Sequence, residues 1–141
     1  MKKCYEILVR KSLEESSHYV DDCKIITFIV ICENPSDIIP NLVKNSTWLE
    51  EDLITSDIYS IECNNFTPII ATEVLDSAGY STTFKKTPIC FEGYIEDSLV
   101  DVLVIFAFDI NSALAECLSR CSDTVKFKRC VQTDYIPIII E

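Results

Sequence analysis

The chain has 141 residues, of which 48% are hydrophobic and 25% charged, and its formal net charge is −11. The length suits one domain or two very small ones, and the hydrophobic share supports a packed core, which excludes a disordered chain. The acidic balance disfavours ordinary nucleic-acid binding, because an acidic surface repels phosphate backbones.

The cysteine content and the N-terminus bear on the compartment. The eight cysteines lie mostly inside apolar runs, where a free thiol packs as a small hydrophobic side chain. The first residues lack the apolar core and the cleavage site of a signal peptide. The longest uncharged apolar stretch falls short of the roughly 20 residues that span a bilayer. We therefore expect a cytoplasmic protein with free cysteines, without direct contact to nucleic acid or membrane.

An internal repeat is the main pattern in the sequence. Residues 103–122 align under 27–46 without a gap, and two flanking segments match in the same order. Upstream, Cys4-Tyr5-Glu6 matches Cys90-Phe91-Glu92, and downstream, residues 66–70 match 135–139. The identities in the central alignment are Ile29/Ile105, Ser36/Ser112, Leu42/Leu118 and Ser46/Ser122. The pattern predicts a tandem duplication of one small ββαβ unit.

The first unit covers residues 1–70. Strands are expected over 4–13 and 23–32, and a third over 53–70 that breaks near 64–65. Between them, Asn34 is a plausible helix N-cap and Pro35 occupies the first helical position, after which apolar residues recur at helical spacing. Pro68 marks the end of the third strand as an edge or a bulge.

A linker over residues 71–87, with one helical turn near 73–78, leads into the second unit over residues 88–141. Strands are expected over 89–96, 99–108 and 125–140, and a helix capped by Asn111 or Ser112 lies between the last two. The predicted fold class is α+β, with duplicated ββαβ units, antiparallel-rich sheet or sheets, and one main helix per unit in one compact domain.

Two of the expected strands, 23–32 and 99–108, are apolar on both faces, which is typical of strands at the centre of a sheet. Two helices cover only one face of a six-stranded sheet. The other face must contact the partner unit or another copy of the chain, so we expect a homo-oligomer.

Candidate catalytic and metal-binding residues are few. Cys117 and Cys121 lie one helical turn apart and could share a metal ion with Cys130. Structural zinc needs four ligands, usually with a Cys-x-x-Cys pair that is absent here, so an apolar helix face is favoured. The single histidine, His18, falls in a hairpin loop, where a surface role is favoured over a Cys–His nucleophile. No catalytic residue, metal or cofactor is predicted.

Trp48 stands next to three acids and is the first candidate contact residue. A lone tryptophan in this setting anchors a partner or stacks on a ligand base, unless it packs at the end of the helix. The three acids are Glu50, Glu51 and Asp52.

Lys126, Lys128 and Arg129 form the only basic cluster. Lys126 and Lys128 share one strand face, which suits a phosphate or an acidic patch on a neighbouring subunit as well as ordinary charged surface. Glu6 and Glu92 hold equivalent places in the two units, either as outward strand residues or as a pair facing a cleft.

The chain resembles small tandem-repeat proteins of uncharacterised function that are encoded by Bacteroides-type bacteria, their phages and mobile elements. The resemblance is carried by Cys4-Tyr5-Glu6, Cys90-Phe91-Glu92 and the segment 132–137. It implies an origin in a phage or a mobile element and no known activity.

Three functions remain open from the sequence. The first is a non-catalytic intracellular binding protein that engages a protein partner through its acidic surface. The second is a protein that binds or sequesters a small, nucleotide-like ligand, with Trp48 on the base and the basic cluster on the phosphate. The third is a small enzyme, which a single histidine and two glycines disfavour.

Overall fold

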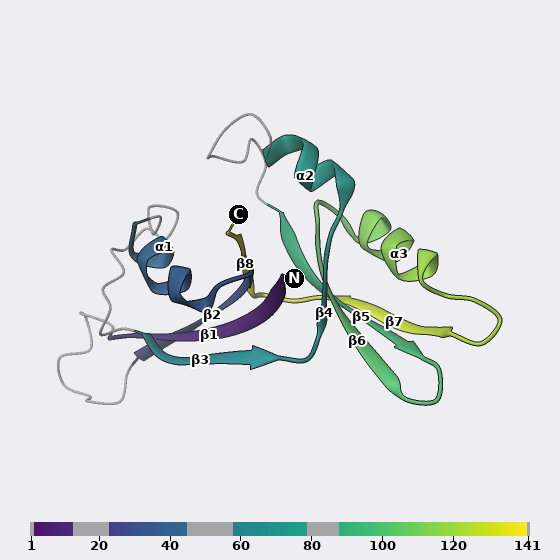
Figure 1. The fold of residues 1–141 in the computed structure, drawn as a ribbon, viewed down its shortest axis with the longest axis horizontal. Coiled ribbons are helices and arrows are strands. Elements are labelled where there is room, and N and C mark those ends of the chain that lie inside the picture. Colours follow the sequence, from purple (N-terminus) through teal and green to yellow (C-terminus); the bar gives the residue numbers. More distant parts are fainter. Residues whose placement is uncertain (1, 13–22, 45–57, 79–87, 141) are drawn as a thin grey trace. The chain divides into compact units, whose positions relative to one another are not determined.

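The computed structural model describes residues 2–12, 23–44, 58–78 and 88–140, and within these ranges the chain forms eight strands and three α-helices (Figure 1). The strands make two four-stranded sheets, so the α+β class predicted from the sequence is confirmed. The pairing is mostly antiparallel, as expected, while β4 pairs with β6 in parallel.

The first sheet has the order β3-β1-β2-β8 and the second the order β4-β6-β5-β7. The strands of the first sheet are β1 (Lys3–Ser12), β2 (Cys23–Cys32), β3 (Ile58–Asn64) and β8 (Ile136–Ile139). Those of the second are β4 (Thr67–Ile70), β5 (Ile89–Glu96), β6 (Val100–Ala107) and β7 (Lys126–Gln132). The helices are α1 (Ile38–Lys44), preceded by a 3-10 turn η1 (Pro35–Asp37), α2 (Thr72–Ala78) and α3 (Ile110–Ser119).

The chain divides into two compact units, each built around one sheet. Unit 1 comprises Met1–Asn64 and Ile138–Glu141, and unit 2 comprises Asn65–Pro137. The unit boundaries predicted from the sequence, at residues 70 and 88, describe the sequence repeat and differ from the bounds of these compact units. The duplication itself stays a prediction.

The two sheets have corresponding strand orders, and each half of the chain gives its last strand to the other sheet. β4 follows β3 in sequence but pairs with β6, and β8 follows β7 but lies beside β2. The same backbone hydrogen bond closes both exchanges. The Ala71 N–H donates to the Phe106 carbonyl at 2.9 Å, and the Ile140 N–H donates to the Ile31 carbonyl at 3.0 Å.

This exchange corrects the prediction of one continuous last strand over residues 125–140. The segment splits into β7 and β8, which belong to different sheets, and the expected break in the preceding unit falls between β3 and β4. Pro68 and Pro137 lie in the exchanged strands, and both strands are outermost in their sheets. At such a position the sheet does not need the backbone N–H that proline lacks. The expected edge position of Pro68 is confirmed.

Helix capping fixes which residues correspond between the units. The Asn34 side chain accepts from the Ser36 N–H at 3.1 Å, which confirms the predicted cap. The helix α3 is capped by Asp109, whose carboxylate accepts from the Ser112 N–H at 2.8 Å, so the predicted caps Asn111 and Ser112 are wrong. Asp109 is extended, with φ −150° and ψ 168°, which is the backbone conformation an N-cap needs.

When the two helix caps are aligned with each other, the segment β2–α1 aligns with β6–α3 in a register that differs by one residue from the ungapped sequence alignment. With Asn34 placed on Asp109, the fully buried Ile38 of α1 corresponds to Ala113 of α3. By the same register, the buried Leu42 corresponds to Cys117. The identical residues of the ungapped alignment therefore do not occupy equivalent positions in the two units. The equivalent positions are those that share the same place relative to the helix cap and the same burial.

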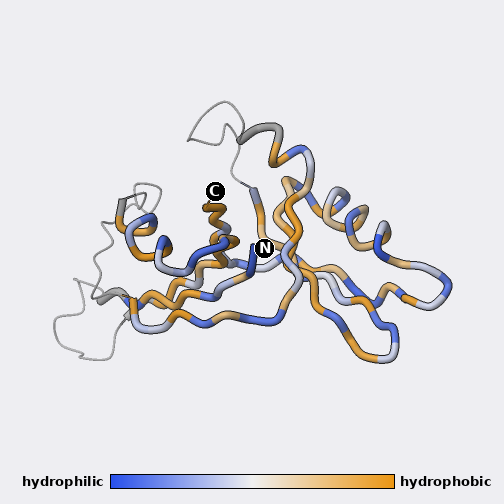
Figure 2. Tube along the Cα trace, in the orientation of Figure 1, coloured by the Kyte–Doolittle hydropathy of each residue, from blue (hydrophilic) through white to orange (hydrophobic). Residues whose placement is uncertain are grey.

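The strands expected at the centre of a sheet are central and buried. β2 is almost continuously buried from Phe28 to Cys32, and β6 from Leu103 to Ala107. The far ends of both hairpins are exposed, as Ile25 (59%) and Leu99 (81%) show. In Figure 2 α3 carries alternating hydrophobic and hydrophilic stretches. Its buried residues are Ala113 and Cys117, and the Cys117 sulfur lies against Gly93 of β5.

Candidate functional site

The basic cluster predicted from the sequence lies on β7, an outer strand of unit 2. Lys128 Nζ lies 2.9 Å from Glu96 Oε2, and the Arg129 guanidinium lies over the Tyr94 ring at 4.2 Å from its centroid. The Tyr94 hydroxyl in turn donates to Glu92 Oε2 at 2.6 Å. Two of the three cations are therefore bound to groups on β5, the neighbouring strand.

The backbone of β7 contains a bulge that places Lys128. β5 and β7 shift register between Tyr94 and Ile95, which pair with Arg129 and Phe127, so that Lys128 is the extra residue. The pairing of β1 with β3 shifts at the corresponding place, between Leu8 and Val9. A bulge twists an outer strand and hinders the addition of a further strand.

The acidic cluster Glu50, Glu51 and Asp52, together with Trp48, lies outside the described residues, as does His18. These contact residues stay predictions.

Glu6 and Glu92 are both half-buried, each within its own unit. Glu6 stands directly across from Glu62 of β3, whereas Glu92 accepts the hydrogen bond from Tyr94 and stands across from Val131. The equivalent positions thus have different partners: two carboxylates on neighbouring strands in unit 1, and a phenol–carboxylate pair in unit 2.

Three thiols of unit 2, those of Cys90, Cys117 and Cys130, have raised pKa values. Burial raises the pKa of Cys90 to about 12 and that of Cys117 to about 12. The Cys117 thiol also donates a hydrogen bond to Cys130, and the Cys121 thiol donates to the Cys117 carbonyl at 3.3 Å. Because the thiolate is the nucleophile and the metal ligand, the raised pKa values make Cys90 and Cys117 poor candidates for either role.

The predicted metal set Cys117, Cys121 and Cys130 can be examined directly. Among the residues that the structure describes, no group of three or more His, Cys, Asp or Glu side chains is arranged to hold a metal ion.

The outer strands differ in how they are protected against pairing with another chain. β4 and β8 each contain a proline, and β7 carries three cations. Lysine and proline on outer strands are common devices that block edge-to-edge association. Of the described outer strands, β3 alone has neither, with the sequence Ile58-Tyr59-Ser60-Ile61-Glu62-Cys63-Asn64.

Two large apolar side chains of β3 are exposed to solvent, Tyr59 at 53% and Ile61 at 37%. β3 also contains Ser60, whose buried hydroxyl has no hydrogen-bond partner among the described residues. Sequence reasoning missed this strand as a candidate surface. The absence of lysine, arginine and proline from residues 58–64 could have indicated an outer strand that is open to pairing.

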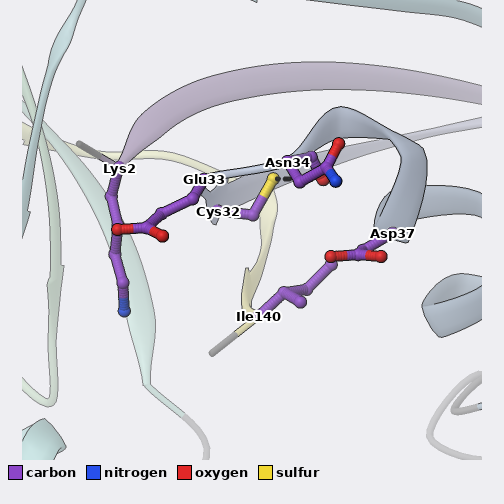
Figure 3. Close-up of a pocket in the computed structure, with 6 residues that line it drawn as sticks. All are labelled: Lys2, Cys32, Glu33, Asn34, Asp37 and Ile140. Carbon is purple, nitrogen blue, oxygen red and sulfur yellow. Dashed lines mark hydrogen bonds between the residues drawn. The ribbon is translucent and has the colours of Figure 1, made fainter.

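A cavity of about 390 Å³ lies in unit 1, where β2 runs into η1 (Figure 3). The Cys32 thiol, which points to the Asn34 carbonyl at 3.7 Å, forms part of its wall. Burial and the nearby Asp37 carboxylate raise the pKa of Cys32, while Lys2 opposes the rise. Its lining residues are Lys2, Cys32, Glu33, Asn34, Asp37 and Ile140. Apart from Asn34, which the sequence predicts as a helix cap, none of them stood out in the sequence, because the start of β1, η1 and the end of β8 meet only in the folded chain.

Comparison of the chain with protein-family models, with curated proteins and with solved structures gives no significant match. In the described part of the chain, no helix has both the length and the apolar character needed to cross a membrane. The fold and the two surfaces, β3 and the cavity of unit 1, are therefore the basis for a functional proposal.

Proposed function

We propose that this chain is a non-catalytic binding protein that engages a protein partner by adding an extended segment of that partner to the outer strand β3. The observation that carries the proposal is the contrast between β3 and the other described outer strands. Proline protects β4 and β8, and three cations protect β7. β3 has neither, and apart from the register shift that β7 also has, it offers an outer backbone edge with Tyr59 and Ile61 exposed beside it.

The charge of the chain supports a neutral or basic segment as the partner. The net charge is −11, and β3 itself contributes Glu62 and no cation. Long-range attraction steers a basic partner toward an acidic surface and raises its association rate. The proposed partner is therefore a basic extended segment of a host or phage protein, which the resemblance to phage-encoded tandem-repeat proteins supports. An intracellular setting suits the free cysteines.

The basic cluster on β7 then has a protective role. Lys128 and Arg129 are held on β5 by Glu96 and Tyr94, and their positive charges discourage another strand from pairing there. A nucleotide-like ligand at this cluster is less favoured, since a phosphate would have to replace contacts that these two cations already make.

The test uses two substitutions matched in exposure. Ile61 on β3 and Val131 on β7 are both 37% exposed, so Ile61→Lys and Val131→Lys introduce the same charge at equally accessible positions. The protein is used to capture partners from extracts of the native host, and one purified partner is then titrated against each variant. We expect Ile61→Lys to weaken binding at least tenfold and Val131→Lys to leave it within about twofold, because only the first blocks β3.

Hydrogen exchange provides the second measurement. Partner binding is expected to slow exchange of the amides of Tyr59, Ile61 and Cys63, and circular dichroism checks that both variants are folded. Equal effects of the two substitutions, or protection of β7 in place of β3, contradict the proposal. Light scattering on the purified chain separates strand addition by a different protein from pairing of β3 with a second copy, the homo-oligomer expected from the sequence.

A further inference from the structure

Three of the described cysteines lie where α3 covers the sheet of unit 2. The helix packs against β5, β6 and β7 (Figure 1). Cys117 is fully buried there, while Cys121 and Cys130 are half-buried. The Cys121 thiol is turned to the Cys117 carbonyl at 3.3 Å. All three thiols are free, so the structure shows their reduced form.

Gly93 brings Cys117 and Cys130 together. Residues that stand directly across from each other in an antiparallel pair project to the same face of the sheet. Cys130 is paired with Gly93, and the Cys117 sulfur occupies the space that a β-carbon at residue 93 would need on that face. In agreement with this placement, the Cys117 thiol donates a hydrogen bond to Cys130. The two sulfur atoms are therefore in contact between the helix and the sheet.

Cys130 is the most buried residue of β7. It is half-buried, whereas every other residue of this outer strand is exposed. The contacts that Lys128 and Arg129 make with β5 lie at the surface. A covalent bond between Cys130 and α3 would therefore anchor a strand that is otherwise held mainly by backbone pairing with β5.

We propose that Cys117 and Cys130 form a redox-sensitive lock, in which a peroxide converts their two thiols into one disulfide that ties β7 to α3. The proposal goes beyond strand addition at β3, because it concerns unit 2 and a covalent change. The two sulfurs need to move only from contact to a bond of about 2.05 Å, which rotation of the side chains and a small shift of α3 allow. A thiol reductant reopens the lock.

The difference in exposure sets the order of two steps. Cys130 is accessible to a small oxidant, whereas Cys117 is fully buried and its pKa is raised to about 12. Hydrogen peroxide oxidises the Cys130 thiol to a sulfenic acid, which keeps one peroxide oxygen while the other leaves as water. The Cys117 sulfur then bonds to the Cys130 sulfur, and the sulfenic hydroxyl leaves with the Cys117 proton as a second water. Contact with the reacting sulfur offsets the low thiolate fraction of Cys117.

Tryptic digestion of the oxidised full-length protein identifies the bond. Cleavage after lysine and arginine places Cys117 in the peptide 87–120, Cys121 in 121–126 and Cys130 in 130–141. The folded chain is treated with hydrogen peroxide, and its remaining thiols are alkylated before digestion. We expect mass spectrometry to show 87–120 linked to 130–141, and dithiothreitol to remove the link. Since 87–120 also contains Cys90, the link should persist in Cys90→Ala and disappear in Cys117→Ala.

Cys121→Ala separates the lock from a competing pair and should leave the link unchanged. Three results overturn the proposal: a link between 87–120 and 121–126, loss of the expected link in Cys121→Ala, or the same mixture of links in the folded chain and in a chain oxidised in urea. Absence of any link at a peroxide dose that oxidises the exposed Cys63 overturns it as well.

The anchoring of β7 is measured by thermal unfolding and by hydrogen exchange. A disulfide between residues 117 and 130 restricts the unfolded chain, so the oxidised protein should unfold at least about 5 °C above the reduced protein. The amides of β7 should also exchange more slowly, and Cys130→Ala should abolish both effects of peroxide. A linked protein that unfolds at the same or a lower temperature than the reduced protein refutes the lock. Ile61→Lys on β3 should change neither the link nor the temperature rise, so failure of strand addition and failure of the lock are separate results.

Discussion

The sulfur of Cys117 on α3 lies over Gly93 of β5, in the space that a β-carbon at residue 93 would need. The same β-carbon would lie 3.1 Å from Ile105 Cδ1 on β6. The absence of a side chain at Gly93 therefore lets α3 approach the sheet of unit 2. It also places Cys117 beside Cys130, the residue paired with Gly93 across β7.

Gly93→Ala is expected to lower the free energy of unfolding by about 1–3 kcal/mol, because the added methyl group forces α3 away from the sheet. Urea denaturation measures the change. Cys117→Ala in the same chain should recover most of the loss, since it removes the atom with which the methyl group collides. If the double variant is no more stable than Gly93→Ala, the contact with Cys117 does not explain the cost.

The two most strongly shifted thiols predict a loss of stability at high pH. Burial raises the pKa of Cys90 and of Cys117 to about 12, from an ordinary value near 9. Between these values the unfolded chain releases protons that the folded chain keeps, so the folded state binds more protons and the free energy of unfolding falls as pH rises. Below about pH 9 these thiols do not make the free energy of unfolding depend on pH.

Urea midpoints between pH 7 and 12 test this linkage. The fall in the free energy of unfolding above pH 9 should be shallower in Cys90→Ala than in the unsubstituted chain. The hydrogen bond of Tyr94 to Glu92 raises the pKa of the phenol and adds a slope of the same sign. An unchanged slope in Cys90→Ala contradicts the assignment.

Tyr94→Phe removes the hydrogen bond to Glu92 and keeps the ring beneath Arg129. We expect a loss of about 0.5–1 kcal/mol, below the usual range for a bond to a charged acceptor because the pair is half-exposed. Tyr94→Leu also removes the cation–π contact and should cost more. Equal losses in thermal unfolding would mean that the Arg129 contact contributes nothing measurable.

The two helix caps should contribute similarly to stability if they are structurally equivalent. Asn34→Ala and Asp109→Ala each remove a side-chain acceptor from a helix start and should cost about 1 kcal/mol. Asn111→Ala, at the position predicted from the sequence, should change the unfolding midpoint little. A larger effect at Asn111 than at Asp109 would restore the original cap assignment.

The strand exchange makes a paired prediction. Ile69 on β4 and Ile138 on β8 are both 5% exposed and hold corresponding places in the two sheets. Each substitution to alanine should cost about 2–4 kcal/mol, as for other buried isoleucines. Hydrogen exchange should then show faster exchange in β6 for Ile69→Ala and in β2 for Ile138→Ala. The opposite assignment would mean that the last strands stay with their own halves.

Much of the local structure follows from the sequence. The strands Cys23–Cys32 and Ile89–Glu96 have the bounds expected from their apolar patterns, and Asn34 caps its helix as predicted. A short helix also forms at Thr72–Ala78, close to the predicted turn. These features depend on residues close together in the chain, where apolar periodicity, proline and cap residues act directly on the backbone.

Only the tertiary structure decided where the last strands lie and which surfaces remain open. Residues 67–70 and 136–139 have nearly the same sequence, and nothing in either segment indicates which of the two similar sheets it joins. The cavity of unit 1 likewise joins Lys2, Asp37 and Ile140, which are brought together by the exchange of β8. Such pairings depend on the free energy of whole sheets and helices packing together, which a local sequence pattern does not encode.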